Sequence, residues 1–365
     1  MGGKEPIETA IIGDLQVTSP APRPAWHEIL GRDPNGLVFQ TPEWTEAMCS
    51  TGYYTDASRL YEAADGRRWL VPMVRKAAMV APLAAQFSLP HGWGLGGAIT
   101  EGDFTGEEAQ ITYADLARQP VIQTGVHPSP LQTGAWEAAI PRGVPSAELL
   151  EHVLDLEGGF SAVWEKRFQS TTRTAIRKAE HSNLVVKAEN SGELNRIFYE
   201  MFMDWSIRRG RERHLPAWLA RLTNQRRDPL ERFDRISKHL GQAYRVFVAF
   251  REGTPVAAAI YLTFGENAFY YRGTSRRELA HPVRANDLLQ CLMIQAASDA
   301  GCRYYHMGES GGVGSLMRFK AGFGAVPTPF REYSIERLPI TRAQAQKERL
   351  IKTMETLLLS RNNND

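Results

Sequence analysis

The chain has 365 residues, 43% of them hydrophobic and 23% charged, with a formal net charge of +2 at pH 7. This length favours two domains over one, and the composition is typical of a water-soluble globular protein, which excludes the disordered and fibrous classes. No apolar run approaches the roughly 18 residues needed to span a bilayer. Three cysteines are too few for a disulfide framework or a zinc site. We therefore expect a cytoplasmic protein without membrane insertion and without a metal.

The first part of the chain contains capping and turn signals, and its amino terminus shows no signal-peptide pattern. Thr41 can cap a helix that begins at Pro42. Asp65-Gly66, between two β-rich runs, indicates a hairpin. The glycine-rich run 87–97 could let a phosphate or a substrate approach the backbone. Such runs are more often sharp turns, and Trp93 within this one is a candidate pocket residue.

A link rich in proline and glycine at residues 143–146 predicts a domain boundary. We expect an N-terminal domain over residues 1–145 and a C-terminal domain over residues 146–340 that carries the active site. The C-terminal domain should begin with a helix over residues 146–156. A C-terminal helix and a disordered tail should occupy residues 341–365.

The middle of the chain is basic. Residues 161–245 contain eighteen Lys and Arg against ten Asp and Glu, although the whole chain is nearly neutral. This excess favours an anionic partner such as RNA, a diphosphate or a nucleotide sugar, while a solvated helical face with salt bridges explains it equally well. Any RNA contact would be to the backbone, because no aromatic-interleaved RNA-reading module is present. The candidate phosphate contacts are Arg173, Arg177, Lys178, Arg208, Arg209, Arg211 and Arg213.

The last part of the chain changes periodicity. Three runs rich in β-branched and aromatic residues predict an antiparallel meander over residues 244–251, 254–264 and 267–273. A helix with one apolar face follows and ends at Gly301. A short strand at residues 302–307 then leads into a glycine-rich turn and a second short helix with Phe319 and Lys320. A loop at the carboxyl end of a strand, followed by a helix, is where α/β folds often build a site.

This order of helices, meander, helix and strand is that of the GNAT acyltransferase fold, and the sequence resembles the FemABX branch of that fold, the aminoacyltransferases related to peptidoglycan bridge-building enzymes. The C-terminal motifs are the specific part of the resemblance. The matching segments are FQTPEW at 39–44, RTAIRKAEHSNLVV at 173–186, YYRGTS at 270–275, ANDLLQCLMIQAASDAG at 285–301, YYHMGES at 304–310 and LMRFKAGFGA at 316–325.

The resemblance implies an α/β (α+β) fold of tandem GNAT-like domains, each a mixed, mostly antiparallel sheet flanked by helices. It also implies transfer of an acyl group, usually an aminoacyl group from a charged tRNA, to an amine. In that family the lysine of a Phe-Lys motif lies at the reaction centre, and the corresponding residue here is Lys320. On its spacing alone, Lys320 would be an ordinary surface lysine of a helix.

The absence of one motif bears on which acyl donor the protein uses. Acetyl-CoA-dependent GNAT enzymes hold the pyrophosphate with an Arg/Gln-x-x-Gly-x-Gly/Ala turn, whereas residues 276–285 contain no glycine and Pro282 lacks an N–H donor. We therefore expect no permanently bound cofactor and aminoacyl-tRNA as co-substrate, with acetyl-CoA as the alternative. The partners would be the tRNA acceptor end and an amine of a small metabolite, peptide or cell-wall precursor, bound by a monomer or homodimer. A catalytically silent binding protein is a further alternative.

Acyl transfer needs a deprotonated amine and a stabilised oxyanion, and an oxyanion-hole donor contributes about 3–4 kcal/mol. Lys320 is the candidate for that donor, and Glu309, beyond the strand end, could orient or deprotonate the amine. Tyr270 alternates with Tyr271 along its strand and is expected to lie in the core. The candidate substrate-binding residues are Phe319, Tyr271, Arg272, Asn286, Ser310 and Trp93.

Overall fold

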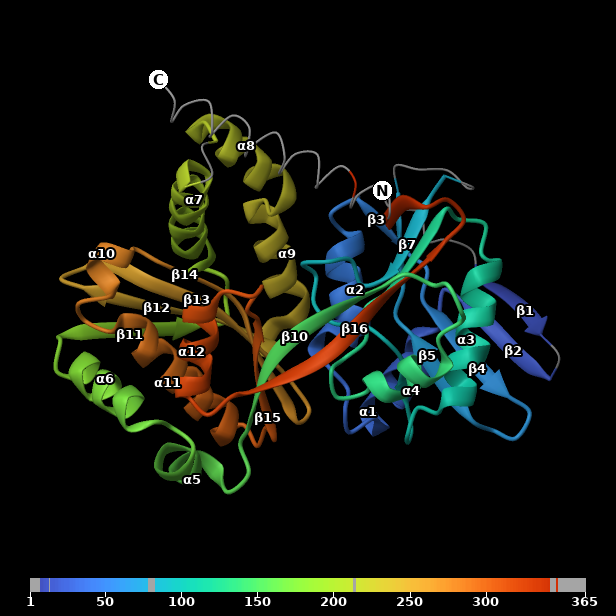
Figure 1. The fold of residues 1–365 in the computed structure, drawn as a ribbon, viewed down its shortest axis with the longest axis horizontal. Coiled ribbons are helices and arrows are strands. Elements are labelled where there is room, and N and C mark those ends of the chain that lie inside the picture. Colours follow the sequence, from blue (N-terminus) through green and yellow to red (C-terminus); the bar gives the residue numbers. More distant parts are fainter. Residues whose placement is uncertain (1–6, 13, 78–82, 213–214, 342–345, 347–365) are drawn as a thin grey trace.

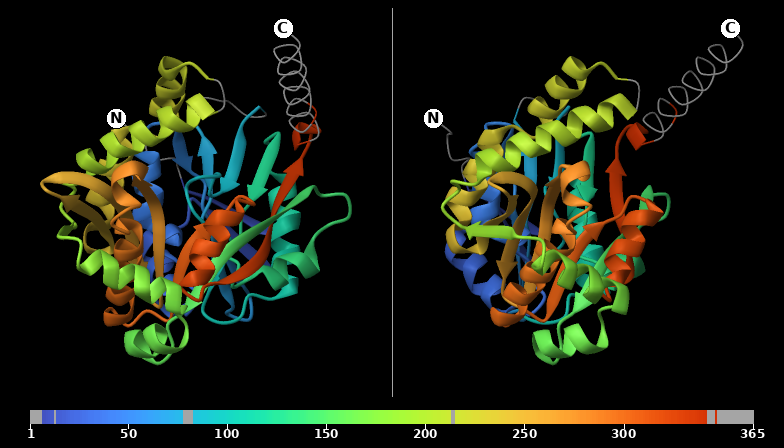
Figure 2. Two further views of the ribbon diagram at one scale, coloured as in Figure 1. Left: turned by 60° about the vertical axis from the view of Figure 1, so that its left-hand side comes forward. Right: turned by 90° about the vertical axis from the view of Figure 1, so that its left-hand side faces the viewer.

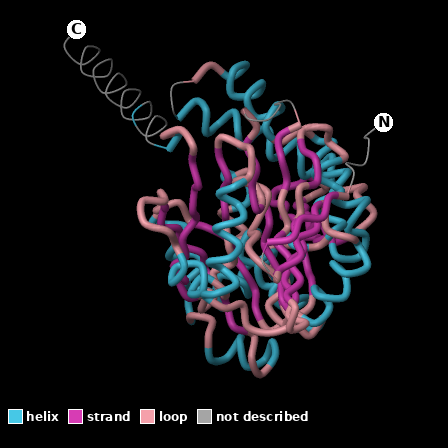
Figure 3. The backbone as a smooth tube through the Cα atoms, turned by 90° about the vertical axis from the view of Figure 1, so that its right-hand side faces the viewer, coloured by secondary structure: helices cyan, strands magenta, loops and turns pink. Residues whose placement is uncertain are grey.

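The computed structural model describes residues 7–12, 14–77, 83–212, 215–341 and 346. Most of the expected C-terminal helix and tail, and Arg213, lie outside these residues. Strands form the interior and helices lie mainly on the outside (Figure 3). The N-terminal part and the C-terminal part of the chain occupy opposite sides of the molecule, and two long strands, β10 (Ser146–Asp155) and β16 (Val326–Glu336), run between them (Figure 1).

The described strands form two sheets. The smaller sheet is antiparallel, in the order β1 (Glu8–Ile12), β2 (Leu15–Ser19), β4 (Arg59–Ala63), β5 (Arg68–Val71) and β8 (Ile99–Thr100). The larger sheet has the order β11 (Leu184–Glu189), β12 (Tyr244–Arg251), β13 (Thr254–Phe264), β14 (Asn267–Ser275), β15 (Tyr304–Glu309), β10, β16, β9 (Gln123–Val126), β7 (Ala85–Ser88), β6 (Val74–Lys76) and β3 (Tyr54–Asp56). Its parallel pairs are β14 with β15 and β7 with β9. The predicted α/β (α+β) class with mixed, mostly antiparallel sheets is confirmed.

Helices cover both parts of these sheets. The N-terminal part contains α1 (Arg23–Arg32), the 3₁₀ helix η1 (Val38–Gln40), α2 (Pro42–Cys49), α3 (Gly106–Arg118) and α4 (Thr133–Ala139). The C-terminal part contains α5 (Gly159–Lys166), α6 (Ser170–Glu180), α7 (Asn195–Glu212), α8 (Ala217–Arg227), α9 (Leu230–Leu240), η2 (Gly241–Ala243), α10 (Arg277–Ala280), α11 (Ala285–Asp299) and α12 (Gly314–Gly322).

Strand β10 replaces the helix that the sequence predicted over residues 146–156. It pairs with β16 from Ser146 to Val153 and with β15 from Glu151 to Asp155, so both of its edges are hydrogen-bonded. Tertiary pairing of this kind overrides local propensity. Strand β16 in turn pairs with β9, which joins the two parts of the molecule in one continuous sheet (Figure 2). The division into domains at residue 145 stays a prediction.

An apolar cluster holds the two parts together. Phe39 lies 4.6 Å from Phe269 and 5.0 Å from Trp44 between ring centroids, so η1 and α2 pack directly against β14. The predicted start of α2 is confirmed, since the side chain of Thr41 accepts a hydrogen bond from the backbone N–H of Trp44 at 3.1 Å. Gly94 has φ +97°, and a Cβ there would collide with the Phe39 ring. Gly94 is therefore required by this packing, while His91, Gly92, Gly94 and Leu95 of the same glycine-rich run also line a cavity.

Candidate active site

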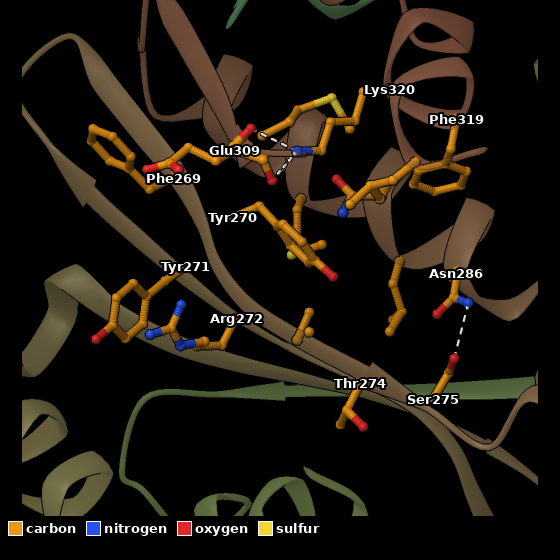
Figure 4. Close-up of a pocket in the computed structure, with 18 of the residues that line it drawn as sticks. Phe269, Tyr270, Tyr271, Arg272, Thr274, Ser275, Asn286, Glu309, Phe319 and Lys320 are labelled. Carbon is orange, nitrogen blue, oxygen red and sulfur yellow. Dashed lines mark hydrogen bonds between the residues drawn. The ribbon is translucent and has the colours of Figure 1, made fainter. Parts of the chain in front are cut away.

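A cavity of about 710 Å³ opens where β14 and β15 separate. The two parallel strands are paired only between Asn267–Phe269 and Tyr304–His306. Beyond these residues each strand continues without the other, and side chains from α11 and α12 line the opening (Figure 4). Residues of the N-terminal part complete the walls. Because the strands no longer bond to each other here, the cavity can offer backbone groups as well as side chains to a ligand.

Lys320 lies in the wall of this cavity and is only 2% exposed. Its ammonium group donates hydrogen bonds to the carbonyl oxygens of Gly308 at 2.6 Å and Glu309 at 2.9 Å (Figure 4). An ammonium has three N–H donors, so one remains for a ligand. Burial lowers the pKa of Lys320 to about 8, against the opposing effect of the carboxylates of Glu151 and Glu309. Lys320 therefore fixes α12 to the end of β15 and keeps a proton donor at the cavity.

Two carboxylates accompany Lys320 on adjoining strands. Glu151 on β10 and Glu309 on β15 are directly opposite in the strand register, and both line the cavity. Glu151 is 3% exposed, whereas one third of the Glu309 side chain is accessible. Burial raises the pKa of Glu309, and the negative charges of Glu151 and Glu332 add to this, while His91 and Lys320 oppose it.

Histidines form the other wall of the same region. His127 follows β9 and places its Nε2 atom 4.0 Å from Oε1 of Glu309. Both of its ring nitrogens lack a hydrogen-bond partner among the described residues, and it is 5% exposed. Burial, helped by His91, lowers the pKa of His127 to about 4, so its imidazole is neutral near pH 7. No sequence pattern pointed to His127 or Glu151, because each is a single polar residue far along the chain from the Phe-Lys motif, His127 directly after β9 and Glu151 in the middle of β10.

Several predicted site residues do meet at the cavity. Its lining includes six of them besides Lys320 and Glu309, namely Phe319, Tyr271, Arg272, Asn286, Arg208 and Arg209. Asn286 does not cap α11, whose N-cap is Arg284, and instead donates from Nδ2 to Oγ of Ser275 at 3.2 Å (Figure 4).

Tyr270, expected in the core, lies at the centre of the cavity (Figure 4). Side chains still alternate along β14 here, since Phe269 and Tyr271 belong to one apolar cluster and Tyr270 packs against the other. The cavity opens beside Tyr270 because the pairing of β14 with β15 ends at Phe269. Gly273 makes room for the ring, because a Cβ at that position would overlap the Tyr270 hydroxyl. Burial raises the pKa of Tyr270 to about 12, which keeps the phenol protonated. It is therefore a second hydrogen-bond donor at the cavity.

Tyr271 and Arg272 instead tie the cavity to the N-terminal part. The hydroxyl of Tyr271 lies 2.6 Å from Nη2 of Arg232, and Nη2 of Arg272 donates to the carbonyl of Gly92 at 2.9 Å. The Tyr271 ring is 9% exposed and packs against the cluster around Trp44. These side chains touch the cavity, but much of their hydrogen-bonding capacity is already used.

The remaining predicted residues are not part of the lining. Trp93 is 6% exposed, and the guanidinium of Arg232 lies 3.6 Å from its ring centroid. Ser310 is 2% exposed, with Oγ 3.3 Å from Nδ1 of His152. Three basic residues of α6 and one of α7 also lie outside it, namely Arg173, Arg177, Lys178 and Arg211. Arg213 lies outside the described residues.

Basic and aromatic side chains form another part of the cavity wall. Arg208 and Arg209 reach it from α7 together with Trp205, and Arg277 reaches it from α10. Arg208 donates from Nη2 to the carbonyl of Ser275 at 3.3 Å, and the guanidinium of Arg209 lies 5.6 Å from the Trp205 ring centroid. The cavity thus combines an acidic and imidazole-rich region near Lys320 with arginines on α7 and α10.

The described residues contain neither a membrane-spanning helix nor a cluster of metal-ligating side chains. None of their helices is both long and apolar enough to cross a membrane. They also contain no group of three or more His, Cys, Asp or Glu side chains placed to hold a metal ion.

Comparison with known proteins agrees with this architecture. A family model described as an acetyltransferase (GNAT) domain matches residues 166–320. The crystal structure of FemX superposes with a TM-score of 0.66 at 12% sequence identity, over 89% of this chain and 98% of that chain. A conserved protein of unknown function from Bacteroides thetaiotaomicron VPI-5482 gives 0.50 at 10% identity, over 86% and 97%. L-PGS from Bacillus licheniformis gives 0.47 at 14% identity, over 86% and 97%.

At these identities the structural similarity concerns the fold. The chain has the GNAT acyltransferase fold in the arrangement seen in FemX, which confirms the resemblance to the FemABX branch at the level of the fold. A search of curated protein sequences found no match.

Proposed function

We propose that this protein, with its GNAT acyltransferase fold and its similarity to the structure of FemX, forms an amide bond by transferring an aminoacyl group from aminoacyl-tRNA to an amine. The acceptor would be an amine of a small metabolite, a peptide or a cell-wall precursor. The observation that carries the proposal is the position of Lys320, which is buried, fixed by two carbonyl oxygens and next to the cavity at the separation of β14 and β15.

Lys320 and Tyr270 would stabilise the transition state. When an amine attacks an ester carbonyl, the carbonyl oxygen becomes an oxyanion. The remaining N–H of Lys320 and the protonated phenol of Tyr270 are donors already held in place, and each such donor lowers the activation barrier by about 3–4 kcal/mol. Because these side chains are fixed before the substrate arrives, little reorganisation is needed during the reaction.

The tRNA end of the donor would bind at the arginines. Arg208, Arg209 and Arg277 line the cavity and are suited to backbone phosphates, and Trp205 beside them offers an aromatic surface for stacking. Through the proposed donor, the protein would meet the tRNA acceptor end in the cytoplasm, as a monomer or a homodimer.

The local backbone also favours an ester donor over a CoA thioester. The segment after β14, where acetyl-CoA-dependent enzymes have a glycine-containing turn, forms the short helix α10. The N–H groups of Leu279 and Ala280 donate to the carbonyl of Arg276 at 2.9 and 2.8 Å, so they are not free to hold a diphosphate. Transfer from acetyl-CoA or another acyl-CoA is the second candidate, because the matching family model is that of an acetyltransferase domain.

The test is incubation of the pure protein with labelled charged tRNAs, or with labelled acetyl-CoA, in the presence of a panel of amines. We expect amide-linked label that disappears when the charged tRNAs are treated with RNase beforehand. Label that survives RNase and requires the thioester would replace the tRNA donor by CoA. Absence of transfer from either donor would refute the enzymatic proposal and favour a binding protein. Free CoA at about 100 times its dissociation constant would add about 2.7 kcal/mol of stability only if CoA binds.

A further inference from the structure

Three buried polar side chains on neighbouring strands form a row of polar contacts that ends at the cavity. Asn267 on β14 and His306 on β15 are both 0% exposed, and Glu151 on β10 is 3% exposed. Oδ1 of Asn267 lies 3.0 Å from Nε2 of His306, and Nδ1 of His306 lies 3.4 Å from Oε1 of Glu151. Of these three side chains, Glu151 lines the cavity.

The protonation of His306 follows from its neighbours. The Nδ2 group of Asn267 donates to the carbonyl of Gly36 at 3.2 Å, which fixes the amide so that its oxygen faces His306. Nε2 of His306 must therefore carry the proton of the neutral ring, and Nδ1 then presents a lone pair toward the carboxylate of Glu151. Nδ1 of His306 and Oε2 of Glu151 both lack a hydrogen-bond partner within the described ranges.

One added proton would relieve the unfavourable contact between these two acceptor atoms. Placed between Nδ1 and Oε1, it would turn two facing acceptors into a hydrogen bond inside a buried environment, where an unpaired polar atom is destabilising. The charged and titratable groups around the pair are Lys320 from α12, Glu309 from β15 and His152 from β10.

We propose that Glu151, oriented by His306 and Asn267, is the group that takes the proton from the attacking amine. This inference rests on the proposed function. The ammonium form of the acceptor gives one proton to the Glu151–His306 pair, and its nitrogen attacks the ester carbonyl. A C–N bond forms while the C–O bond to the ribose oxygen breaks. The leaving oxygen takes the second proton from nitrogen, and the pair releases its proton to solvent. Glu309, more exposed, assists in binding the ammonium.

Kinetics of Glu151→Gln test this step, because the substitution keeps the shape and removes the basicity. With the donor and amine that the wild type uses, we expect kcat to fall by about 10²–10⁴-fold with an unchanged KM for the donor. Glu148→Gln, on the exposed part of the same strand, is the matched control and should retain wild-type rates. An active wild type with an equally active Glu151→Gln would overturn this inference and leave the proposed function standing. An inactive wild type would overturn both.

A second readout needs no substrate and holds even if Glu151→Gln folds poorly. In ¹⁵N-histidine-labelled wild-type protein, His306 (assigned with His306→Gln) should show a protonated Nε2 and an Nδ1 without a proton under the conditions of the activity assay. Glu151→Asp, which retracts the carboxylate, should shift the Nδ1 resonance and lower kcat. An Nδ1 signal typical of a protonated nitrogen, or one that does not respond to Glu151→Asp, would contradict the proposal.

Discussion

Removal of the Lys320 ammonium is the perturbation with the clearest structural consequences. Lys320→Met keeps most of the volume and deletes the donors to the carbonyls of Gly308 and Glu309. Loss of one oxyanion donor should lower kcat by about 10²–10³-fold. Arg318→Met, an exposed position on the same helix, is the control and should leave kcat within about twofold, since surface substitutions are usually neutral.

Lys320→Met should also change how the free energy of unfolding depends on pH. The pKa of Lys320 falls from 10.5 in the unfolded chain to about 8 in the folded protein, because burial disfavours the charged form. The unfolded state therefore binds more protons between these two values, and the wild type should gain stability relative to Lys320→Met as the pH rises through that window. The gain should reach about 3 kcal/mol between pH 7 and pH 11.

Urea unfolding of the two proteins at pH 7, 8, 9, 10 and 11 measures this difference, with Arg318→Met as reference. A stability difference that does not change with pH would mean that the Lys320 ammonium is solvated in the folded protein. A full catalytic rate for Lys320→Met would mean that it does not act on the reacting carbonyl. Either result would refute the reasoning for this site.

Three further predictions concern the walls of the cavity. Gly273→Ala should displace the Tyr270 ring and lower the free energy of unfolding by about 1–3 kcal/mol in thermal or urea unfolding. Transfer activity should be lost, and unchanged activity would show that the position of the ring is unimportant. Arg209→Ala should raise the KM for charged tRNA and reduce the slope of log affinity against log salt by about one, whereas an unchanged slope would place the phosphates elsewhere. His127→Phe should remove an acid-sensitive group, because the pKa of His127 is about 4 in the folded protein and 6.5 in the unfolded chain. The free energy of unfolding of the wild type should therefore fall by about 3 kcal/mol relative to the variant between pH 7 and pH 4. Parallel curves of stability against pH would contradict the buried, neutral state of His127.

Local signals in the sequence predicted those parts of the molecule whose structure is decided locally. The cap at Thr41, the meander that became β12 to β14, and the strand, glycine turn and helix around Lys320 all follow from neighbouring residues, and all are confirmed. The Phe-Lys motif led to the cavity because the motif and the cavity wall lie on the same short helix.

Long-range pairing decided the features that the sequence missed. Residues 146–156 were predicted as a helix, and they form β10 because β15 and β16 bond to both of its edges. The same pairing brings Glu151 opposite Glu309. Tyr270 lines the cavity because the pairing of β15 with β14 ends at Phe269, and where this pairing ends depends on the partner strand as well as on the local sequence.

The most direct test of the central claim is single-turnover transfer from labelled aminoacyl-tRNA to an acceptor amine by wild-type protein and by Lys320→Met. The account predicts an RNase-sensitive amide product with the wild type and a rate at least about 100-fold lower with the variant. Equal rates for the two proteins, or product formed only from a thioester in the absence of tRNA, would contradict it.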